Sequence, residues 1–245
     1  MAQPEYSVIV PAYQAAAVIG DCVRALAQQT LDRARYEIIV VDDGSTDATG
    51  DVAQAAGADR VVRVPHGGPA AARNAGIAAA QGEIVLFTDA DCEPADDWIA
   101  RMVAPFADLQ VMGVKGTYRT RQSSLIARLV QLEFEIRYAR MAELPCIDFV
   151  DTYAAAYRRP LLVTYGGFDT AFPIPSAEDV DLSFRLARAG HWLVFAPEAW
   201  VWHRHPATLR RYLVRKARFG YWRALLYVRY PDKITGDTHT DPALK

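Results

Sequence analysis

The sequence EIIVVDDGSTD, residues 37–47, contains a complete transition from strand to helix. Its four β-branched apolar residues, 38–41, are typical of a strand buried on both faces. The acids and Gly44 that follow favour a tight turn and a capped helix start. A strand that passes directly into a helix is the repeating unit of α/β proteins, so we expect that fold class.

The same unit recurs on both sides of this stretch. Strand-like segments at 6–10, 37–41, 60–64 and 83–88 alternate with helical patterns at 16–29, 47–57, 69–80 and 95–107. The alternation predicts βαβ crossovers and a mainly parallel sheet flanked by helices. The second half is less regular, and we expect a helix at 124–141, a strand at 153–157, a helix opening at Glu178 and a basic helix at 208–230.

The composition excludes several classes of protein. Half of the 245 residues are apolar, which is enough to bury a continuous core. Cys22, Cys92 and Cys146 are odd in number and far apart, so they build neither a disulfide framework nor a zinc site, and a reducing cytosol fits best. No apolar run approaches the roughly 18 residues that cross a bilayer, so we expect a soluble or peripheral protein.

The chemistry-bearing residues follow the predicted strands, where parallel sheets bind ligands. Asp89-Ala90-Asp91 closes one strand, and two acids one residue apart present oxygen ligands to a hard divalent cation, although a turn and helix cap would also use them. Asp43 follows another strand and either stabilises the turn or accepts hydrogen bonds from a base or ribose. Arg73 lies on a helix of small residues, as a surface arginine or as a counter-charge for a diphosphate.

Two further motifs lie in the second half. Glu178 and Asp179 begin a helix, where acids complement the N-terminal dipole, but a carboxylate there also suits a general base acting on an acceptor hydroxyl. His203 follows an aromatic run, and its imidazole is either a packed histidine or a metal ligand. Neither motif alone decides between these interpretations.

The ordered set of motifs resembles the family 2 glycosyltransferases, which have the A-type glycosyltransferase fold, a Rossmann-like mixed, mainly parallel sheet flanked by helices. The resemblance covers nearly the whole chain. Its pieces, in order, are Val8 to Tyr13, Val41 to Asp47, Ala72-Arg73-Asn74, Thr88 to Asp91, Arg158-Arg159, Gly166 to Asp169, Glu178 to Leu182, and His203.

The resemblance implies roles for single positions. Asp91 matches the principal metal ligand, with Asp89 beside the ribose and His203 as a possible addition, and the ion would be Mn²⁺ or Mg²⁺. Asp179 matches the catalytic base, with Glu178 supporting it or contacting the acceptor. The nucleotide would lie against Pro11, Ala12, Tyr13, Asp42, Asp43, Arg73, Asp89 and Ala90.

The resemblance also implies a reaction. Such enzymes invert the anomeric centre of a nucleotide sugar, here preferably a UDP-sugar, in glycan or glycolipid assembly. The processive members carry Gln-x-x-Arg-Trp after the base, which is missing here, so single additions are favoured. We expect one domain, 1–232, with a nucleotide-binding half (about 1–110), an acceptor-binding half (about 111–207) and the basic helix 208–230, then a polar tail, 233–245.

The basic helix suggests a location for the protein. No Asp or Glu lies between Glu198 and Asp232, whereas eight Lys or Arg do. Aromatic residues interleave with these cations, a composition typical of an interfacial helix, although a helix packed on the catalytic domain is the alternative. We therefore expect a cytoplasmic protein with possible peripheral contact to the membrane face, a glycan or lipid-linked acceptor, and no nucleic acid partner.

Other functions are disfavoured by sequence. A dinucleotide-binding oxidoreductase would carry Gly-x-Gly-x-x-Gly where residues 11–14 read Pro-Ala-Tyr-Gln. A sugar-phosphate nucleotidyltransferase and a non-catalytic module that binds nucleotide sugars remain as alternatives. The second is disfavoured because Asp91 and Asp179 are both present.

Overall fold

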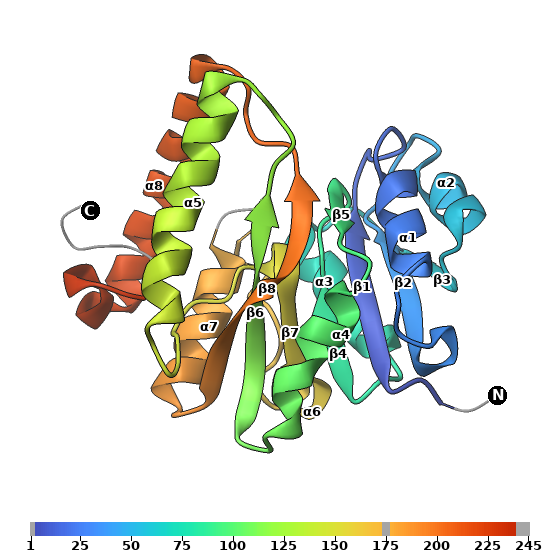
Figure 1. Ribbon diagram of the computed structural model, residues 1–245, viewed down its shortest axis with the longest axis horizontal. Helices are drawn as coiled ribbons and strands as arrows, with labels where there is room; N and C mark the ends of the chain where they lie inside the picture. Colours follow the sequence, from blue (N-terminus) through green and yellow to red (C-terminus); the bar gives the residue numbers. More distant parts are fainter. Residues whose placement is uncertain (1–2, 173–176, 239–245) are drawn as a thin grey trace.

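The computed structural model describes residues 3–172 and 177–238 (Figure 1). Its strands form one mixed sheet in the order β3-β2-β1-β4-β7-β6-β8-β5. The strands are β1 Tyr6–Ala12, β2 Tyr36–Asp42, β3 Arg60–Arg63, β4 Ile84–Phe87, β5 Cys92–Pro94, β6 Val111–Arg119, β7 Ala155–Arg158 and β8 Trp192–His203. The first four pair in parallel, as predicted, whereas β7 runs antiparallel to both β4 and β6.

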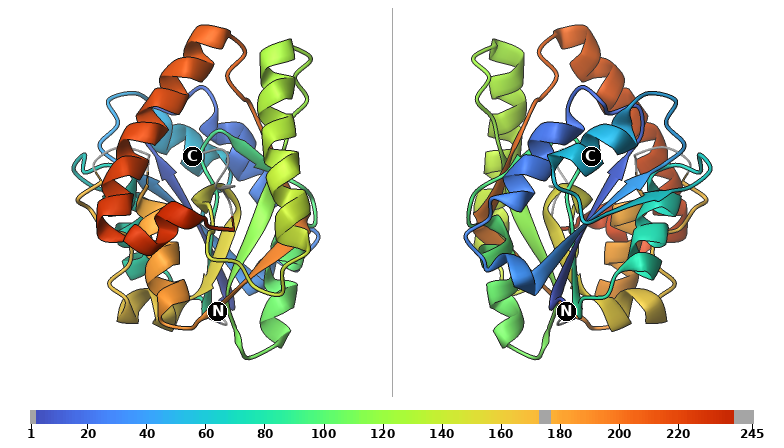
Figure 2. Two further views of the ribbon diagram at one scale, coloured as in Figure 1. Left: turned by 90° about the vertical axis from the view of Figure 1, so that its left-hand side faces the viewer. Right: turned by 90° about the vertical axis from the view of Figure 1, so that its right-hand side faces the viewer.

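Helices cover both faces of the sheet (Figures 1 and 2). Val8 and Val10 of β1 pack on one face with residues of α1, α2 and α4, while Ile9 packs on the other face with residues of α3, α6 and α7. The helices are α1 Ile19–Ala27, α2 Thr49–Ala56, α3 Pro69–Ala79, α4 Trp98–Val103, α5 Leu125–Ala142, α6 Arg159–Thr164, α7 Glu178–Arg188 and α8 Leu209–Arg229. Alternate residues of one strand therefore serve two separate cores.

Several elements differ from the sequence prediction. The helix expected at 95–107 divides into α4 and a 3₁₀ turn, Ala104–Ala107, because Pro105 lacks the N–H that would continue it. The strand expected at 153–157 begins only after a 3₁₀ turn, Thr152–Ala154. Three strands, β5, β6 and β8, were not predicted, since β5 has only three residues and glycines or proline interrupt the apolar pattern of β6 and β8.

α5 and α8 form a separate layer beside the β6–β8 edge of the sheet (Figure 1). Both helices begin close together and diverge along their length (Figure 2). The first two turns of α8 contact the middle of α5, where the Tyr212 hydroxyl donates to Glu133 at 2.5 Å and Lys216 pairs with the same carboxylate at 2.7 Å. Within the described residues, no helix is long and apolar enough to cross a membrane.

Part of the predicted polar tail is packed. A 3₁₀ turn, Pro231–Thr235, follows α8 directly. Lys233 pairs with Asp148 at 2.6 Å, and the backbone N–H of Thr238 donates to the same carboxylate at 2.8 Å. Residues 239–245 of the predicted tail lie outside the described residues.

Candidate active site

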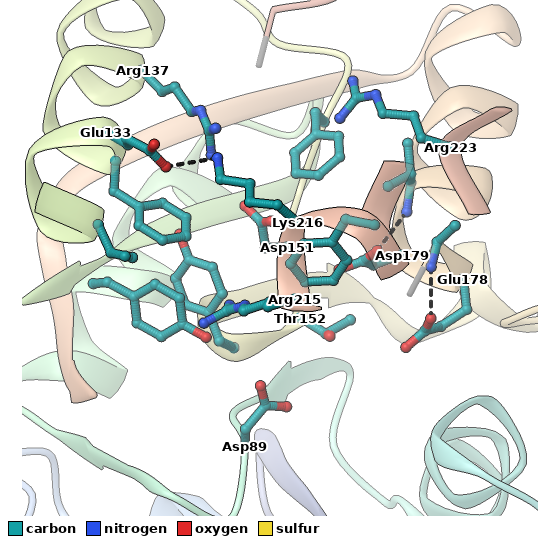
Figure 3. A pocket seen from close by; sticks show the side chains of 18 of the residues that line it. Asp89, Glu133, Arg137, Asp151, Thr152, Glu178, Asp179, Arg215, Lys216 and Arg223 are labelled. Atoms are coloured by element: carbon teal, nitrogen blue, oxygen red, sulfur yellow. Dashed lines mark hydrogen bonds and ion pairs between the residues drawn. The ribbon is translucent and has the colours of Figure 1, made fainter. Parts of the chain in front are cut away.

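A cavity of about 380 Å³ lies between α5, α8 and the start of α7 (Figure 3). Its volume falls within the range of about 300–1,000 Å³ that is common for small-molecule sites. One part is lined by Arg73, Asp89, Glu178 and Asp179, which the sequence motifs singled out. The opposite part is lined by residues of α5 and α8, which bring cations and aromatic rings to the same space.

Arg73 joins two of the motifs. Its guanidinium is 4% exposed and donates from Nη1 to Glu178 at 2.8 Å and from Nη2 to Asp89 at 3.2 Å. Burial alone would lower the pKa of Arg73, but Glu178 and Asp89 outweigh it and raise the pKa. The interpretation of Arg73 as a surface arginine is therefore wrong. A buried guanidinium held by two carboxylates fixes the distance between α3, β4 and α7.

Glu178, Asp179 and Asp181 all lie in the first turn of α7 but have different partners. Glu178 is buried and holds Arg73, so it has a supporting contact. Asp181 is also buried and pairs with Arg185 at 2.9 Å, while accepting from the Tyr230 hydroxyl at 2.8 Å. Asp179 lines the cavity, where its carboxylate accepts from the N–H of Val180 at 2.8 Å. Asp179 is therefore the acid of this turn that is placed to meet a substrate.

The environment of Asp179 raises its pKa to about 7. Burial is the largest cause and the charge of Glu178 adds to it, while Arg73 and backbone N–H groups oppose the shift. A carboxyl group with a pKa near neutrality is suited to take up a proton at physiological pH.

A possible metal site lies at the end of β4. Single ligand atoms of Asp89, Asp91 and Cys92 lie within 4.8 Å of one another. Burial raises the pKa of the Cys92 thiol well above its ordinary value, so this sulfur remains a thiol. His203 at the end of β8 places Nε2 3.5 Å from Asp91 Oδ2. The donors that fit a hard divalent cation are thus two carboxylates and one imidazole.

Hydrogen bonds behind His203 orient its ring. Gln131 donates its Nε2 to the carbonyl of Tyr118, so Oε1 is the atom that accepts from His205 Nε2 at 2.9 Å. Burial is the main cause that lowers the pKa of His205 to about 3, so this ring is neutral and its Nδ1 is an acceptor. His203 Nδ1 lies 3.1 Å from it and must donate. His203 therefore carries a proton on Nδ1, so Nε2 is the ring nitrogen that faces Asp91 and that would bind a metal.

The pKa of Asp91 is shifted in the opposite direction to that of Asp179. Burial acts to raise the pKa of Asp91, but the hydrogen bond and charge of His203 outweigh burial and lower the pKa. The pKa of Asp89 is raised by burial, and the charge of Arg73 opposes the rise. Asp91 is consequently the carboxylate of the pair that stays ionised most readily.

A second group of residues lies at the ends of β1 and β2. Asp43 is buried, and its carboxylate accepts from the N–H groups of Gly67 at 2.8 Å and Gly68 at 3.0 Å. His66 contacts Asp43 at 2.9 Å and stacks on Tyr13 with ring centroids 4.1 Å apart. Tyr13 is 49% exposed, so this stacked pair offers an aromatic surface beside Asp43.

Of the remaining residues predicted to contact the nucleotide, one stabilises a turn and three are apolar. Asp42 is buried and accepts from the Ser45 N–H at 2.9 Å, so the turn interpretation holds for its carboxylate. Pro11 and Ala12 complete β1 beside Asp42, and Ala90 is partly buried against the core. These three side chains are uncharged, so they would contact a nucleotide only by van der Waals packing.

Sequence reasoning missed several residues of this region. His66 carried no pattern of its own. Gln131 and His205 orient His203 through hydrogen bonds. This contact could not be predicted from the sequence, because Gln131 is far from the two histidines in the chain. Among the cations of the basic helix, Arg215 and Lys216 line the cavity, whereas Arg210 and Arg211 are exposed and do not. Composition indicated this helix, but only its orientation selects the cations that face inward.

Residues 7–165 match the model of the family described as glycosyl transferase family 2. The chain belongs to glycosyl transferase family 2. Among curated relatives, it is 35% identical over 205 residues to the pre-mycofactocin glycosyltransferase of Mycobacterium tuberculosis, covering 80% of this chain and 43% of that protein. It is 29% identical to glycosyltransferase AglE of Haloferax volcanii, covering 95% and 76% of the two chains.

A solved structure of another glycosyltransferase has the same fold. The mannosyltransferase PcManGT of Pyrobaculum calidifontis, in complex with GDP-Man and Mn²⁺, aligns with a TM-score of 0.68 and 27% identity. The alignment covers 84% of this chain and 58% of that one. This family 2 chain thus spans less than half of the mycobacterial relative and somewhat more than half of the mannosyltransferase.

The raised pKa of Asp179 predicts how the stability of this family 2 chain depends on pH. Between the ordinary pKa of 3.8 and the folded value of about 7, the folded chain keeps a proton that the unfolded chain has lost. The free energy of unfolding contributed by this group therefore falls as pH rises through that window. Urea denaturation at pH 4, 5, 6 and 7 should show a smaller fall for Asp179→Asn than for the wild type.

The exposed Asp96 provides the control for this measurement. Asp96→Asn should follow the wild-type pH dependence. If Asp179→Asn and Asp96→Asn show the same slope, Asp179 does not have a raised pKa in the folded chain.

Proposed function

We propose that this chain transfers a sugar from a nucleotide-diphosphate sugar to an acceptor hydroxyl, with inversion, dependence on a divalent cation, and one sugar per encounter. The main support for the proposal is that the pKa values of two acids near one cavity are shifted in opposite directions. Asp91 favours its ionised form beside His203, while Asp179 has a pKa of about 7. Such a division is typical of sites that separate charge stabilisation from proton transfer.

The donor would occupy the side of Asp91 and Tyr13. Asp91, His203 and Asp89 would hold Mn²⁺ or Mg²⁺, which supplies positive charge to neutralise the diphosphate. The PcManGT complex with GDP-Man and Mn²⁺ supports this assignment by analogy. The stacked Tyr13 and His66 would lie against the base, with Asp43 holding the loop that carries His66. Uracil is the base that we infer, on the resemblance stated above.

Arg215 supplies further positive charge on the donor side. Its charge acts on Asp91 and on His205, which places it near the proposed metal ligands. No carboxylate ion pair with Arg215 occurs within the described part of the chain. We infer that Arg215 meets the diphosphate, because pre-positioned cations stabilise charge that develops on a leaving group.

Asp179 would act as the base of a single displacement. Its carboxylate takes the proton of the acceptor hydroxyl while that oxygen forms a bond to the anomeric carbon. The bond from this carbon to the diphosphate oxygen breaks on the opposite face, so the nucleoside diphosphate leaves with its electron pair and the anomeric centre inverts. Arg73 would support this step by holding Glu178 and Asp89 in place beside Asp179. The missing Gln-x-x-Arg-Trp sequence supports a single addition.

Binding of a nucleoside diphosphate tests the donor half of the proposal. Calorimetric titration with UDP, and separately with GDP, should show binding that is strengthened by Mn²⁺ and weakened to the metal-free level by chelation. Asp91→Ala removes a charged ligand, so it should abolish the dependence on Mn²⁺ while leaving the metal-free affinity nearly unchanged.

Asp51→Ala, on the exposed surface of α2, is the matched control and should behave as the wild type. Retention of the full manganese effect in Asp91→Ala would remove Asp91 as a ligand. Failure of the wild type to bind either diphosphate would remove the donor assignment itself.

We also propose that α8 contacts an anionic membrane surface. Leu209 and Leu213 are more than half exposed, and Arg210, Arg211 and Arg218 on the same helix are exposed as well. α5 adds four exposed apolar side chains at helical spacing, Leu125, Leu129, Leu132 and Ile136. Exposed apolar residues among cations are typical of helices that lie in the interface of anionic bilayers.

Vesicle sedimentation tests the membrane contact. The protein should sediment with phosphatidylglycerol vesicles at low salt and much less with phosphatidylcholine vesicles. The double variant Arg210→Gln/Arg211→Gln should bind about tenfold or more weakly, since each cation near the surface contributes about 1 kcal/mol. Leu109→Ser, which changes an exposed leucine away from α5 and α8, should have no effect. Equal binding to both kinds of vesicle would contradict the electrostatic contact.

A further inference from the structure

The part of the cavity opposite Arg73 is lined by cations from two helices. Arg137 of α5 and Arg223 of α8 reach over this space from different sides (Figure 3). Lys216 of α8 also lines it and is balanced by Glu133 at 2.7 Å. The proposed mechanism leaves Arg137 and Arg223 unassigned, although both face the cavity that contains Asp179.

Arg137 and Arg223 act on each other as like charges. The pKa of Arg137 is lowered mainly by burial, and the positive charge of Arg223 lowers it further, against the opposing effect of Glu133. The two guanidinium groups line one cavity, and their like charges oppose each other there although Asp237 pairs with Arg223 and Glu133 acts on Arg137. An anion between them would turn that repulsion into attraction, and guanidinium groups are well suited to phosphate oxygens.

Arg223 is held in position before any ligand arrives. Its Nη2 pairs with Asp237, and its Nε donates to the Tyr227 hydroxyl at 2.8 Å. A guanidinium has five N–H donors, so these two contacts use only part of its capacity. Such fixed cations lose little conformational freedom on binding, which favours affinity.

The donor diphosphate has separate cations. Arg215 acts on Asp91 and His205, and Arg73 is bonded to Asp89. The charges that act on Arg137 include those of Glu133 and Arg223, on the other side of the cavity from Arg73. The anion that would suit Arg137 and Arg223 is therefore a second one, on the acceptor side of the cavity.

The walls around these cations are apolar. Val130 and Phe134 of α5 and Phe219 and Leu226 of α8 line the same cavity. They provide a surface for the uncharged part of a ligand, such as a sugar ring or an alkyl chain. A ligand that combines an anionic group, an apolar portion and a hydroxyl within reach of Asp179 fits this arrangement.

We propose that the acceptor of this glycosyltransferase is a phosphate monoester or diester whose phosphate group lies between Arg137 and Arg223. The inference rests on the proposed function, because it places the acceptor beside Asp179. The phosphate belongs either to a lipid or to a soluble sugar or polyol, since both present the same group to the two guanidinium groups.

The proposal is tested with the donor site filled. Protein saturated with UDP, or with GDP in a parallel series, and with Mn²⁺ is titrated with glycerol 3-phosphate against glycerol. In detergent, it is titrated with farnesyl phosphate against farnesol. At least one phosphate should bind tenfold or more tightly than its alcohol. A preference confined to farnesyl phosphate identifies a lipid source, and a preference for glycerol 3-phosphate identifies a soluble one.

Variants connect the effect to the two arginines. Arg137→Gln and Arg223→Gln should each weaken phosphate binding about tenfold or more, while Arg137→Lys should recover part of the loss because it keeps the charge. Arg128→Gln on α5 and Arg24→Gln on α1 are the controls, since both side chains are exposed and neither lines the cavity. All variants should bind the nucleoside diphosphate as the wild type does, which also shows that they are folded.

Two results would overturn the inference. The first is equal affinity for each phosphate and its alcohol, and the second is a loss in Arg137→Gln and Arg223→Gln no larger than in the control variants. Either result leaves intact the binding of nucleoside diphosphate and Mn²⁺, and with it the proposed function. Failure of the wild type to bind any nucleoside diphosphate would instead remove the proposed function and this inference with it.

Discussion

The buried guanidinium of Arg73 is the contact on which the rest of the site depends. From α3, Arg73 binds Asp89, which follows β4 and is 16 residues further along the chain, and Glu178, which begins α7 and is 105 residues further along. A buried ion pair of this kind contributes little net stability, but removing one partner leaves an uncompensated buried charge that costs about 3–5 kcal/mol. Its function is therefore one of position, since it holds Asp89 and Glu178, the neighbour of the proposed base, at a fixed separation.

Asp91 and Asp179, on the two sides of that contact, have different electrostatic environments. Asp91 is kept ionised by the hydrogen bond and charge of His203, whose ring is oriented through His205 and Gln131. Asp179 is kept partly protonated near neutral pH by burial and by the charge of Glu178. The cations divide in the same way, with Arg73 and Arg215 on the donor side and Arg137 and Arg223 on the other. In the proposed function, one cavity would thus provide a place for a leaving diphosphate and a separate place for an acceptor.

Much of this arrangement could be predicted from sequence, and the reasons for the rest are physical. The first four strands and their helices follow from β-branched runs such as Ile38 to Val41, because both faces of a parallel strand are buried. β6 could not be found this way, because it carries glycines and a buried lysine, Lys115. Asp89, Asp91 and Asp179 could be chosen from motifs. The contacts of His66 and Arg137 depend on tertiary packing, which local sequence does not encode.

The central claim is that Asp179 takes the acceptor proton in a single displacement at a donor held by Asp91. It is tested most directly by a proton NMR time course of transfer from the cognate nucleotide sugar, comparing wild type with Asp179→Asn. The account predicts a first product with the anomeric configuration opposite to that of the donor, and a rate about 10² to 10⁴ lower in the variant. A product with retained configuration, or a variant that transfers at the wild-type rate, would contradict it.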